Sequence, residues 1–215
     1  MNKFKKEVLI SVNKINLEGN LVIPDNAIGI VLFSHGAGSS RFSPRNNYVA
    51  RVLEDANIGT LLFDLLTEKE DEIFENRFNI DLLTNRLLAA VNWIKNLKET
   101  QNLNIGLFGA STGASSALKV AAVLGKEIKA VVSRGGRPDL VMEILDRIVS
   151  PTLLIVGGDD EPIINLNALA YEKIRAEKKL EIIPGATHLF EEPGALEKVA
   201  ELAKNWFKNY LKNIN

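Results

Sequence analysis

The chain has 215 residues, of which 46% are hydrophobic and 25% are charged, proportions typical of a soluble globular protein and not of a disordered one. Its 26 Lys and Arg residues nearly balance its 27 Asp and Glu residues, so net charge does not favour binding to nucleic acid or to a membrane surface. The lack of cysteine excludes disulfides, thiolate metal sites and a cysteine nucleophile, and two histidines argue against a multi-histidine metal site. We therefore expect no metal and no cofactor.

The N-terminus carries three lysines, but the apolar run Val8-Leu9-Ile10 that follows is too short for a signal peptide. Elsewhere no apolar stretch approaches the roughly 20 residues that a membrane-spanning helix needs. We therefore expect a cytoplasmic protein.

The first 23 residues alternate weakly between apolar and polar positions, with an interruption at Gly19-Asn20. This pattern predicts an antiparallel strand pair at one edge of a sheet. Six short apolar runs follow, and their continuous apolar character is typical of strands covered on both faces. They are Ile28–Ser34, Thr60–Asp64, Leu103–Gly109, Ala130–Ser133, Thr152–Gly157 and Leu180–Ile183.

Amphipathic segments separate these runs and predict helices; in one of them, Leu83, Leu87, Ala90, Val91 and Ile94 form a single apolar stripe. The predicted helices are Asn47–Ala56, Asp81–Leu97, Thr112–Leu124, Leu140–Ile148, Leu166–Glu177 and Leu196–Leu211.

Alternating strands and helices indicate an α/β protein with a mostly parallel, doubly wound sheet. No linker or repeat divides the chain, so we expect one domain over residues 1–215. The acidic segment Thr67–Asn79 is predicted to be a solvated loop that could contain a short helix. Ligands of such sheets bind at the carboxyl ends of the strands, so the loops after the strands should carry the chemistry.

One of these loops has the pattern G-x-S-x-G, in Gly109-Ala110-Ser111-Thr112-Gly113, between a predicted strand and a predicted helix. A serine on such a sharp turn needs small neighbours, and its hydroxyl projects above the sheet next to a helix N-terminus. The free N–H groups there favour a developing oxyanion. The pattern predicts that Ser111 is a nucleophile; the alternative is a turn that only packs the helix on the strand.

A serine nucleophile needs a base, and His188 follows the last predicted strand, which is where a catalytic histidine is expected. The other histidine, His35, follows the strand that ends at Ser34. We interpret it as structural, holding a loop that supplies a second oxyanion N–H.

The base needs a carboxylate to fix its tautomer. Asp159 and Asp160 lie in a loop between Ser111 and His188, in the chain order expected of α/β-hydrolases. Spacing does not choose between the two, and both could instead cap the helix near Pro162. Asp64, after an earlier strand, is a weaker alternative.

Over about Ile30 to Phe207 the chain resembles α/β-hydrolases of the dienelactone-hydrolase-like group. The resemblance is carried by four segments: Ser34-His35-Gly36-Ala37-Gly38-Ser39-Ser40, Gly109-Ala110-Ser111-Thr112-Gly113, Gly157-Gly158-Asp159-Asp160 and Pro184-Gly185-Ala186-Thr187-His188-Leu189-Phe190.

The resemblance implies that Asp160 is the acid and that the backbone N–H groups of Thr112 and of Ala37 or its neighbour form the oxyanion hole. It departs at the nucleophile, because dienelactone hydrolases proper use cysteine where this chain has Ser111. It therefore implies ester hydrolysis and leaves the dienelactone substrate open. The length of the chain leaves little room for a large cap domain.

Four arginines follow strands that should end at the same crevice, namely Arg41, Arg45, Arg134 and Arg137. Arginine binds carboxylates through two parallel hydrogen bonds, which predicts an anionic substrate. The alternative is that these arginines pair with acids of the chain, such as Asp139 or those of Glu68–Glu72.

Together these features predict a carboxylic-ester or lactone hydrolase that acts on a small molecule through an acyl-enzyme, with Ser111, His188 and Asp160 as its triad. Amide or peptide hydrolysis and acyl transfer use the same residues and stay open as alternatives, as does a non-catalytic binding protein of the same fold. The protein is expected to be a monomer or homodimer, without nucleic acid or membrane partners.

Overall fold

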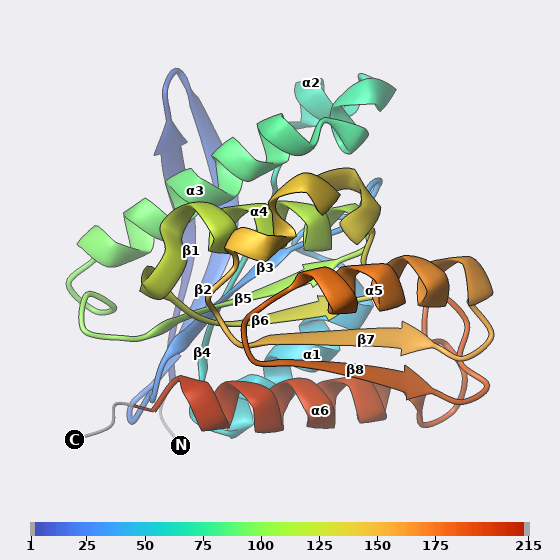
Figure 1. Ribbon diagram of the computed structural model, residues 1–215. Helices are drawn as coiled ribbons and strands as arrows, with labels where there is room; N and C mark the ends of the chain where they lie inside the picture. The colour runs from blue at the N-terminus through green and yellow to red at the C-terminus, as the bar shows by residue number, and fades with distance from the viewer. Residues whose placement is uncertain (1–2, 213–215) are drawn as a thin grey trace.

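The computed structural model describes residues 3–212, which form an eight-stranded sheet with helices on both faces (Figure 1). The strands are β1 (Lys3–Val12), β2 (Ile15–Pro24), β3 (Ile30–Ser34), β4 (Gly59–Phe63), β5 (Ile105–Ala110), β6 (Ile128–Arg134), β7 (Thr152–Gly157) and β8 (Lys178–Ile183). The α-helices are α1 (Pro44–Asp55), α2 (Glu68–Asp71), α3 (Ile80–Asn96), α4 (Thr112–Leu124), α5 (Glu161–Lys173) and α6 (Ala195–Tyr210). Three 3₁₀ segments are η1 (Phe74–Phe78), η2 (Gly125–Glu127) and η3 (Pro138–Arg147).

The strand order is β1-β2-β4-β3-β5-β6-β7-β8. Strands β3 to β8 are mutually parallel, whereas β2 pairs antiparallel with both β1 and β4. This confirms the predicted mostly parallel, doubly wound sheet with an antiparallel N-terminal strand pair. Between β4 and α3 the chain forms only α2 and η1, so the described residues contain no large cap domain.

Two hydrophobic clusters hold the layers together. One lies between the sheet and helices α3, α4 and α5, and the other lies between the sheet and helices α1 and α6 (Figure 1). Every residue of β3, β4, β5 and β7 is buried, which explains why these strands are continuously apolar in sequence. The edge strand β8 is half exposed.

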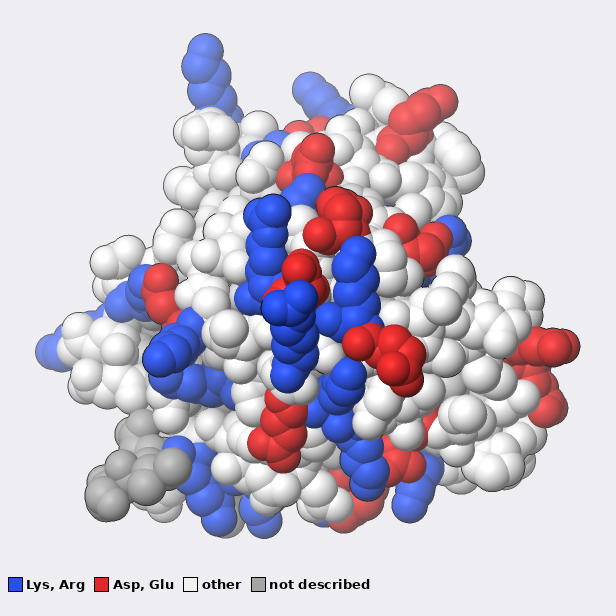
Figure 2. All heavy atoms as spheres, in the orientation of Figure 1, with Lys and Arg blue, Asp and Glu red and all other residues white. Residues whose placement is uncertain are grey.

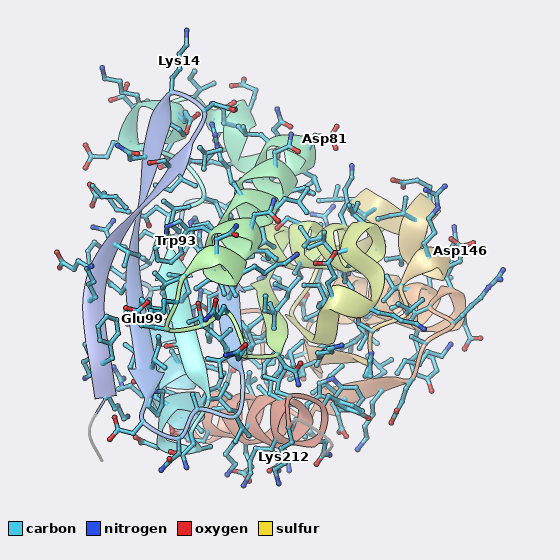
Figure 3. The ribbon with its side chains drawn as sticks, turned by 90° about the vertical axis from the view of Figure 1, so that its left-hand side faces the viewer. Lys14, Asp81, Trp93, Glu99, Asp146 and Lys212 are labelled. Carbon is cyan, nitrogen blue, oxygen red and sulfur yellow. The ribbon has the colours of Figure 1, made fainter. Side chains whose placement is uncertain are left out.

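The hairpin of β1 and β2 forms the opposite edge of the sheet, and Figure 3 shows Lys14 at its tip. Helix α3 runs beside this hairpin, and its partly buried Trp93 packs against the cluster that β1 and β2 help to build. The face in Figure 2 carries acidic and basic side chains close together, in keeping with the near-zero net charge.

Three predicted helices differ from the structure. Helix α1 begins three residues before the predicted Asn47, at Pro44. Residues 140–147 are not α-helical but part of η3, which is broken at Val141, where φ is −144°. The helix predicted from Leu166 begins earlier, at Glu161, because Pro162 lies in the first turn, where a missing N–H costs nothing. That helix ends at Lys173, four residues earlier than predicted, and Lys178 Nζ donates to the carbonyl of Ile174 at 2.7 Å beyond its end.

Candidate active site

Ser111 lies on the sharp turn between β5 and α4, where its φ is 52° and its ψ is −121°. Residues with a side chain rarely adopt a positive φ. The two flanking glycines are required by close packing: a Cβ on Gly109 would lie 2.3 Å from Ala114 Cα, and a Cβ on Gly113 would lie 2.1 Å from the Ser34 carbonyl oxygen. The G-x-S-x-G pattern is therefore explained by sterics at both glycines and by strain at the serine.

The loops after β7 and β8 meet at a hydrogen bond between His188 Nδ1 and Asp160 Oδ2, at 2.7 Å. The His188 side chain is 37% exposed and the Asp160 side chain 14% exposed. Asp160 occupies the N-cap position of α5, yet its side chain makes no capping hydrogen bond and turns to His188 instead. Asp159 is exposed, and its backbone N–H donates to the carbonyl of Ala186 at 2.9 Å.

Ser111 and His188 both contact the segment 134–137, at the end of β6. The Ser111 N–H donates to the Arg134 carbonyl at 3.1 Å, and the Arg137 N–H donates to the Ser111 carbonyl at 3.2 Å. The ring of His188 lies against Gly135, where a Cβ would come within 3.3 Å of the ring carbon Cε1. Gly135 is thus a site residue that the sequence analysis did not identify; a Gly-Gly pair after a buried strand was the available signal.

No hydrogen bond joins Ser111 Oγ to His188 Nε2 within residues 3–212. Hydrogen bonds between a nucleophile and its base are often long before substrate binds and tighten in the complex.

The loop after β3 supplies the other wall of the site. A Cβ on Gly36 would lie 3.1 Å from Ser111 Cβ, so this loop packs directly against the serine. The Ala37 N–H donates to the Thr112 hydroxyl oxygen at 2.9 Å, and the Thr112 N–H, in the first residue of α4, has no acceptor within its own helix. Both N–H groups expected to bind an oxyanion therefore lie close to Ser111, but in the structure the Ala37 N–H is engaged by the Thr112 hydroxyl.

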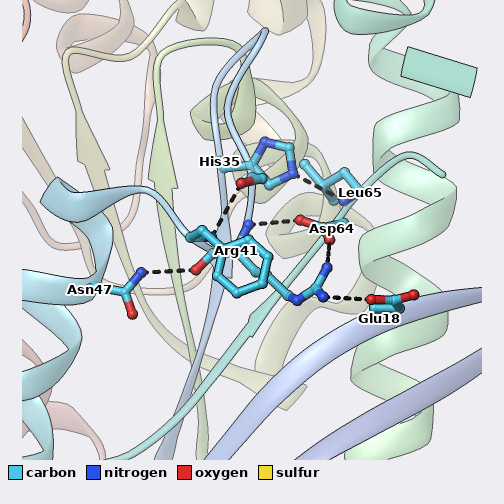
Figure 4. A network of polar contacts seen from close by, with 8 residues as sticks. Glu18, His35, Arg41, Asn47, Asp64 and Leu65 are labelled. Atoms are coloured by element: carbon cyan, nitrogen blue, oxygen red, sulfur yellow. Dashed lines mark hydrogen bonds and ion pairs between the residues drawn. The ribbon is translucent and has the colours of Figure 1, made fainter. Parts of the chain in front are cut away.

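His35 is buried, and both of its ring nitrogens are engaged. Nε2 accepts the N–H of Leu65 at 3.1 Å, and Nδ1 lies 3.0 Å from the Gly36 carbonyl oxygen, to which it donates in the neutral ring (Figure 4). Burial lowers the pKa of His35 below its ordinary value, which favours this neutral form. His35 therefore joins the loop after β3 to the loop after β4.

Asp64 lies in the same network and not near His188. Its carboxylate accepts from the backbone N–H and the guanidinium of Arg41, and Arg41 also pairs with Glu18 (Figure 4). The structure thus places the weakest candidate for the catalytic acid in a structural ion pair.

The four arginines differ in their partners. Arg41 pairs with Asp64 and Glu18, and Arg137 forms two hydrogen bonds with Asp139, at 2.8 Å each. Arg45 pairs with Glu191 at 2.8 Å. Arg134 is buried, and its pKa is lowered to about 10, mainly by burial and also by the charge of Arg45.

Within residues 3–212 no group of three or more His, Asp or Glu side chains is placed to hold a metal ion. In the same residues no helix is both long enough and apolar enough to cross a membrane.

Comparison with known proteins gives a consistent result. The model of the dienelactone hydrolase family matches residues 48–214. The crystal structure of dienelactone hydrolase from Anabaena variabilis is 53% identical and superposes with a TM-score of 0.95, over 98% of this chain and 99% of that one. An esterase domain from a Rhodothermus marinus protein shares the fold at 19% identity, with a TM-score of 0.78 over 98% of this chain and 99% of that one.

A curated relative from Mycobacterium tuberculosis, "Putative phosphoribosyl transferase", is 50% identical over 206 residues, which are 96% of this chain. The aligned part is 46% of that protein, so the chain spans about half the length of this relative.

Proposed function

The chain belongs to the dienelactone hydrolase family, and from this premise we propose that it is a serine hydrolase that cleaves carboxylic esters or lactones through an acyl-enzyme. The observation that supports the proposal most is the strained Ser111 at the strand-to-helix turn, with the hydrogen-bonded pair of His188 and Asp160 on an adjoining wall of the site. This arrangement combines a half-buried nucleophile, a base and a group that orients the base.

In the proposed reaction Ser111 Oγ attacks the ester carbonyl carbon while His188 Nε2 takes the hydroxyl proton. Asp160 accepts the hydrogen bond from His188 Nδ1–H, which holds Nε2 in the unprotonated tautomer and stabilises the imidazolium that forms. The tetrahedral intermediate collapses when its C–O bond breaks, and the alkoxide leaves with the proton from His188. Water then attacks the acyl-serine with His188 as base, releasing the acid and restoring Ser111.

The negative charge of the intermediate is assigned to the N–H groups of Thr112 and Ala37. The Thr112 N–H is a backbone donor fixed by α4, so it needs little reorganisation when the charge develops. The Ala37 N–H donates to the Thr112 hydroxyl in the structure, and it would exchange this acceptor for the oxyanion when a substrate binds. The carbonyl oxygen of a bound ester would then lie next to Ser111, between the two N–H groups.

The name phosphoribosyl transferase belongs to relatives of which this chain matches only 46%, so we do not carry that activity to this chain. Amide hydrolysis and acyl transfer would use the same three residues, and a panel of substrates separates them from ester hydrolysis.

The decisive experiment is labelling with a fluorophosphonate probe, which reacts covalently with activated serine hydroxyls. We expect stoichiometric labelling of the native protein and none of Ser111→Ala, with Ser115→Ala as the matched control because Ser115 is a buried serine of α4 that bonds to the Arg137 carbonyl. A parallel panel of short p-nitrophenyl esters, lactones and p-nitroanilides should show turnover of the oxygen esters first. Absence of labelling together with absence of turnover would favour a binding protein.

A further inference from the structure

Arg134 is the last residue of β6, and it is 8% exposed. Its Nε and Nη1 atoms are buried and have no hydrogen-bond partner within residues 3–212. The guanidinium lies over the ring of Phe190, with its Cζ atom 5.9 Å from the ring centroid. A ring face attracts a cation only weakly compared with a carboxylate, so the charge of Arg134 is desolvated without being neutralised.

A second arginine lies close to Arg134. Arg45, in the first turn of α1, is near enough for its charge to lower the pKa of Arg134 further. The Nε atom of Arg45 is also buried without a hydrogen-bond partner within the described residues, and its Nη1 pairs with Glu191, a side chain that is 62% exposed. Three buried donor nitrogen atoms on two neighbouring guanidinium groups are therefore left without acceptors within the described residues.

Buried donors without acceptors are rare in folded proteins, and a buried charge without a partner is costly. Folding alone does not explain Arg134, because an apolar side chain would fill the same space beside Phe190 without that cost. Arg41 and Arg137 show the contrast, since acids of the chain neutralise both of them. The unpaired charge of Arg134 and the buried Nε of Arg45 instead suit an anion that arrives from outside.

The position of this pair relates it to the candidate active site. The Arg134 carbonyl accepts the Ser111 N–H, and the next residue, Gly135, contacts the His188 ring. Phe190, whose ring lies beneath the Arg134 guanidinium, is two residues after His188 in the sequence. An anion bound to Arg134 would therefore lie at the border of the site, next to the loop that carries the base.

We propose that Arg134 and Arg45 form a subsite for the phosphomonoester group of a substrate, so that the hydrolase acts on a phosphorylated ester or lactone. The assignment to a substrate rests on the proposed function, whereas the binding of phosphate does not. A phosphomonoester carries between one and two negative charges at neutral pH and three acceptor oxygens, which matches two guanidinium groups on different elements. A carboxylate offers one charge and two oxygens, which a single guanidinium already satisfies.

Binding of inorganic phosphate to the Ser111→Ala variant tests the subsite without any turnover. We expect calorimetry at constant ionic strength to show that Arg134→Met raises the dissociation constant at least about 10-fold and that Arg45→Gln raises it by about 3-fold or more. Arg51→Gln, which changes an exposed arginine of the same helix α1, is the matched control and should change it less than about 2-fold. Equal binding by Arg134→Met and the control, or acetate binding as tight as phosphate, would overturn the proposal.

Thermal unfolding separates a binding role from a structural one. Without phosphate, Arg134→Met should unfold at the same or a higher temperature than the native protein, because it removes an unpaired buried charge. A marked fall in the unfolding temperature of both Arg134→Met and Arg134→Gln would assign the residue to the core and overturn the proposal.

Turnover then tests the role in substrate selection. The native protein should hydrolyse para-acetoxyphenyl phosphate with a higher kcat/KM than phenyl acetate, and Arg134→Met should lower that ratio by about 10-fold or more. An unchanged ratio would contradict a substrate subsite. Turnover of neither ester with phosphate binding intact would reject the hydrolase and the substrate role together, while leaving the phosphate site.

Discussion

Two loop regions at the carboxyl edge of the sheet each contain a histidine and an aspartate, and they differ in how completely their polar groups are paired. In the region after β3 and β4, His35 uses both ring nitrogens and Asp64 binds Arg41. In the region after β7 and β8, the only hydrogen bond of the His188 ring within the described part of the chain joins Nδ1 to Asp160, and the His188 side chain is 37% exposed. The histidine and the aspartate of the first region are thus paired within that region, whereas His188 has a ring nitrogen available to a ligand.

This difference in pairing shows where the protein tolerates features that lower its folding stability. The positive φ of Ser111 and the unpaired charge of Arg134 both lie outside the first region, in segments at the candidate active site, and each is unfavourable for folding alone. Such features persist when the surrounding structure enforces them, and they concentrate at functional sites. The residue types in the two regions are similar, so pairing and strain separate them better than composition does.

The largest effect should come from the nucleophile. Ser111→Ala is expected to lower kcat on p-nitrophenyl acetate by about 10⁴-fold or more, because the proposed reaction has no other group that attacks the carbonyl carbon. Circular dichroism and the unfolding temperature should stay close to native values. If Ser111→Ala kept near-native turnover, Ser111 would not be the nucleophile, and the two loop regions would no longer differ in function.

The next effect concerns the acid. Asp160→Asn should lower kcat by about 10³-fold or more, since an amide at this place can donate to His188 Nδ1 and so favours the wrong tautomer. Asp159→Asn is the matched control, because Asp159 is the exposed neighbour whose side chain does not reach His188. If Asp159→Asn were the more damaging change, the role of acid would pass to Asp159, and comparable small losses would contradict a catalytic carboxylate in this loop.

The fold could be predicted well from the sequence because burial on both faces makes strands such as β5 and β7 continuously apolar. The predicted ends were less accurate where local signals conflict. The helix α5 begins at Glu161 because Pro162 suits a first turn, although apolar periodicity pointed to Leu166. The segment of η3 has an amphipathic pattern, but it forms 3₁₀ turns that are interrupted at Val141, where the backbone is not helical.

The candidate site was less predictable in its partners than in its residue types. Strand order and the G-x-S-x-G pattern led to Ser111 and His188, yet the choice between Asp159 and Asp160 depended on loop geometry that spacing does not contain. The four arginines looked equivalent in sequence. Only three-dimensional contacts separate Arg41 and Arg137, which acids neutralise, from the buried Arg134.

A smaller effect should come from the paired region. His35→Leu keeps the volume but leaves the Leu65 N–H without its acceptor, which costs about 1–3 kcal/mol of unfolding free energy, whereas the Gly36 carbonyl still accepts the Ser39 N–H. Chemical denaturation with urea measures this loss. A variant as stable as the native protein would show that these hydrogen bonds contribute little.

The same variant also tests the pH dependence of stability. Burial lowers the pKa of His35, so below about pH 6.5 the unfolded chain binds a proton that the folded protein resists. This group should therefore make the native protein less stable as pH falls from about 6.5, by at most about 1.4 kcal/mol per pH unit. His35→Leu should remove this contribution, whereas His188→Leu should retain it. Parallel profiles of His35→Leu and the native protein would contradict a buried neutral ring.

The smallest effect concerns strain at the serine, and its direction is opposite to that of the loss of activity. Ser111 has a φ of 52°, which costs a residue with a side chain about 1 kcal/mol or more and costs glycine little. Ser111→Gly should therefore raise the free energy of unfolding by about 1 kcal/mol relative to Ser111→Ala, although both variants lack the nucleophile. The two variants differ by one methyl group and both lack the hydroxyl. The difference between their free energies of unfolding in urea therefore isolates the backbone strain. The flexibility that glycine adds to the unfolded chain opposes this gain, and a glycine variant less stable than the alanine variant would mean that the turn stores no net strain.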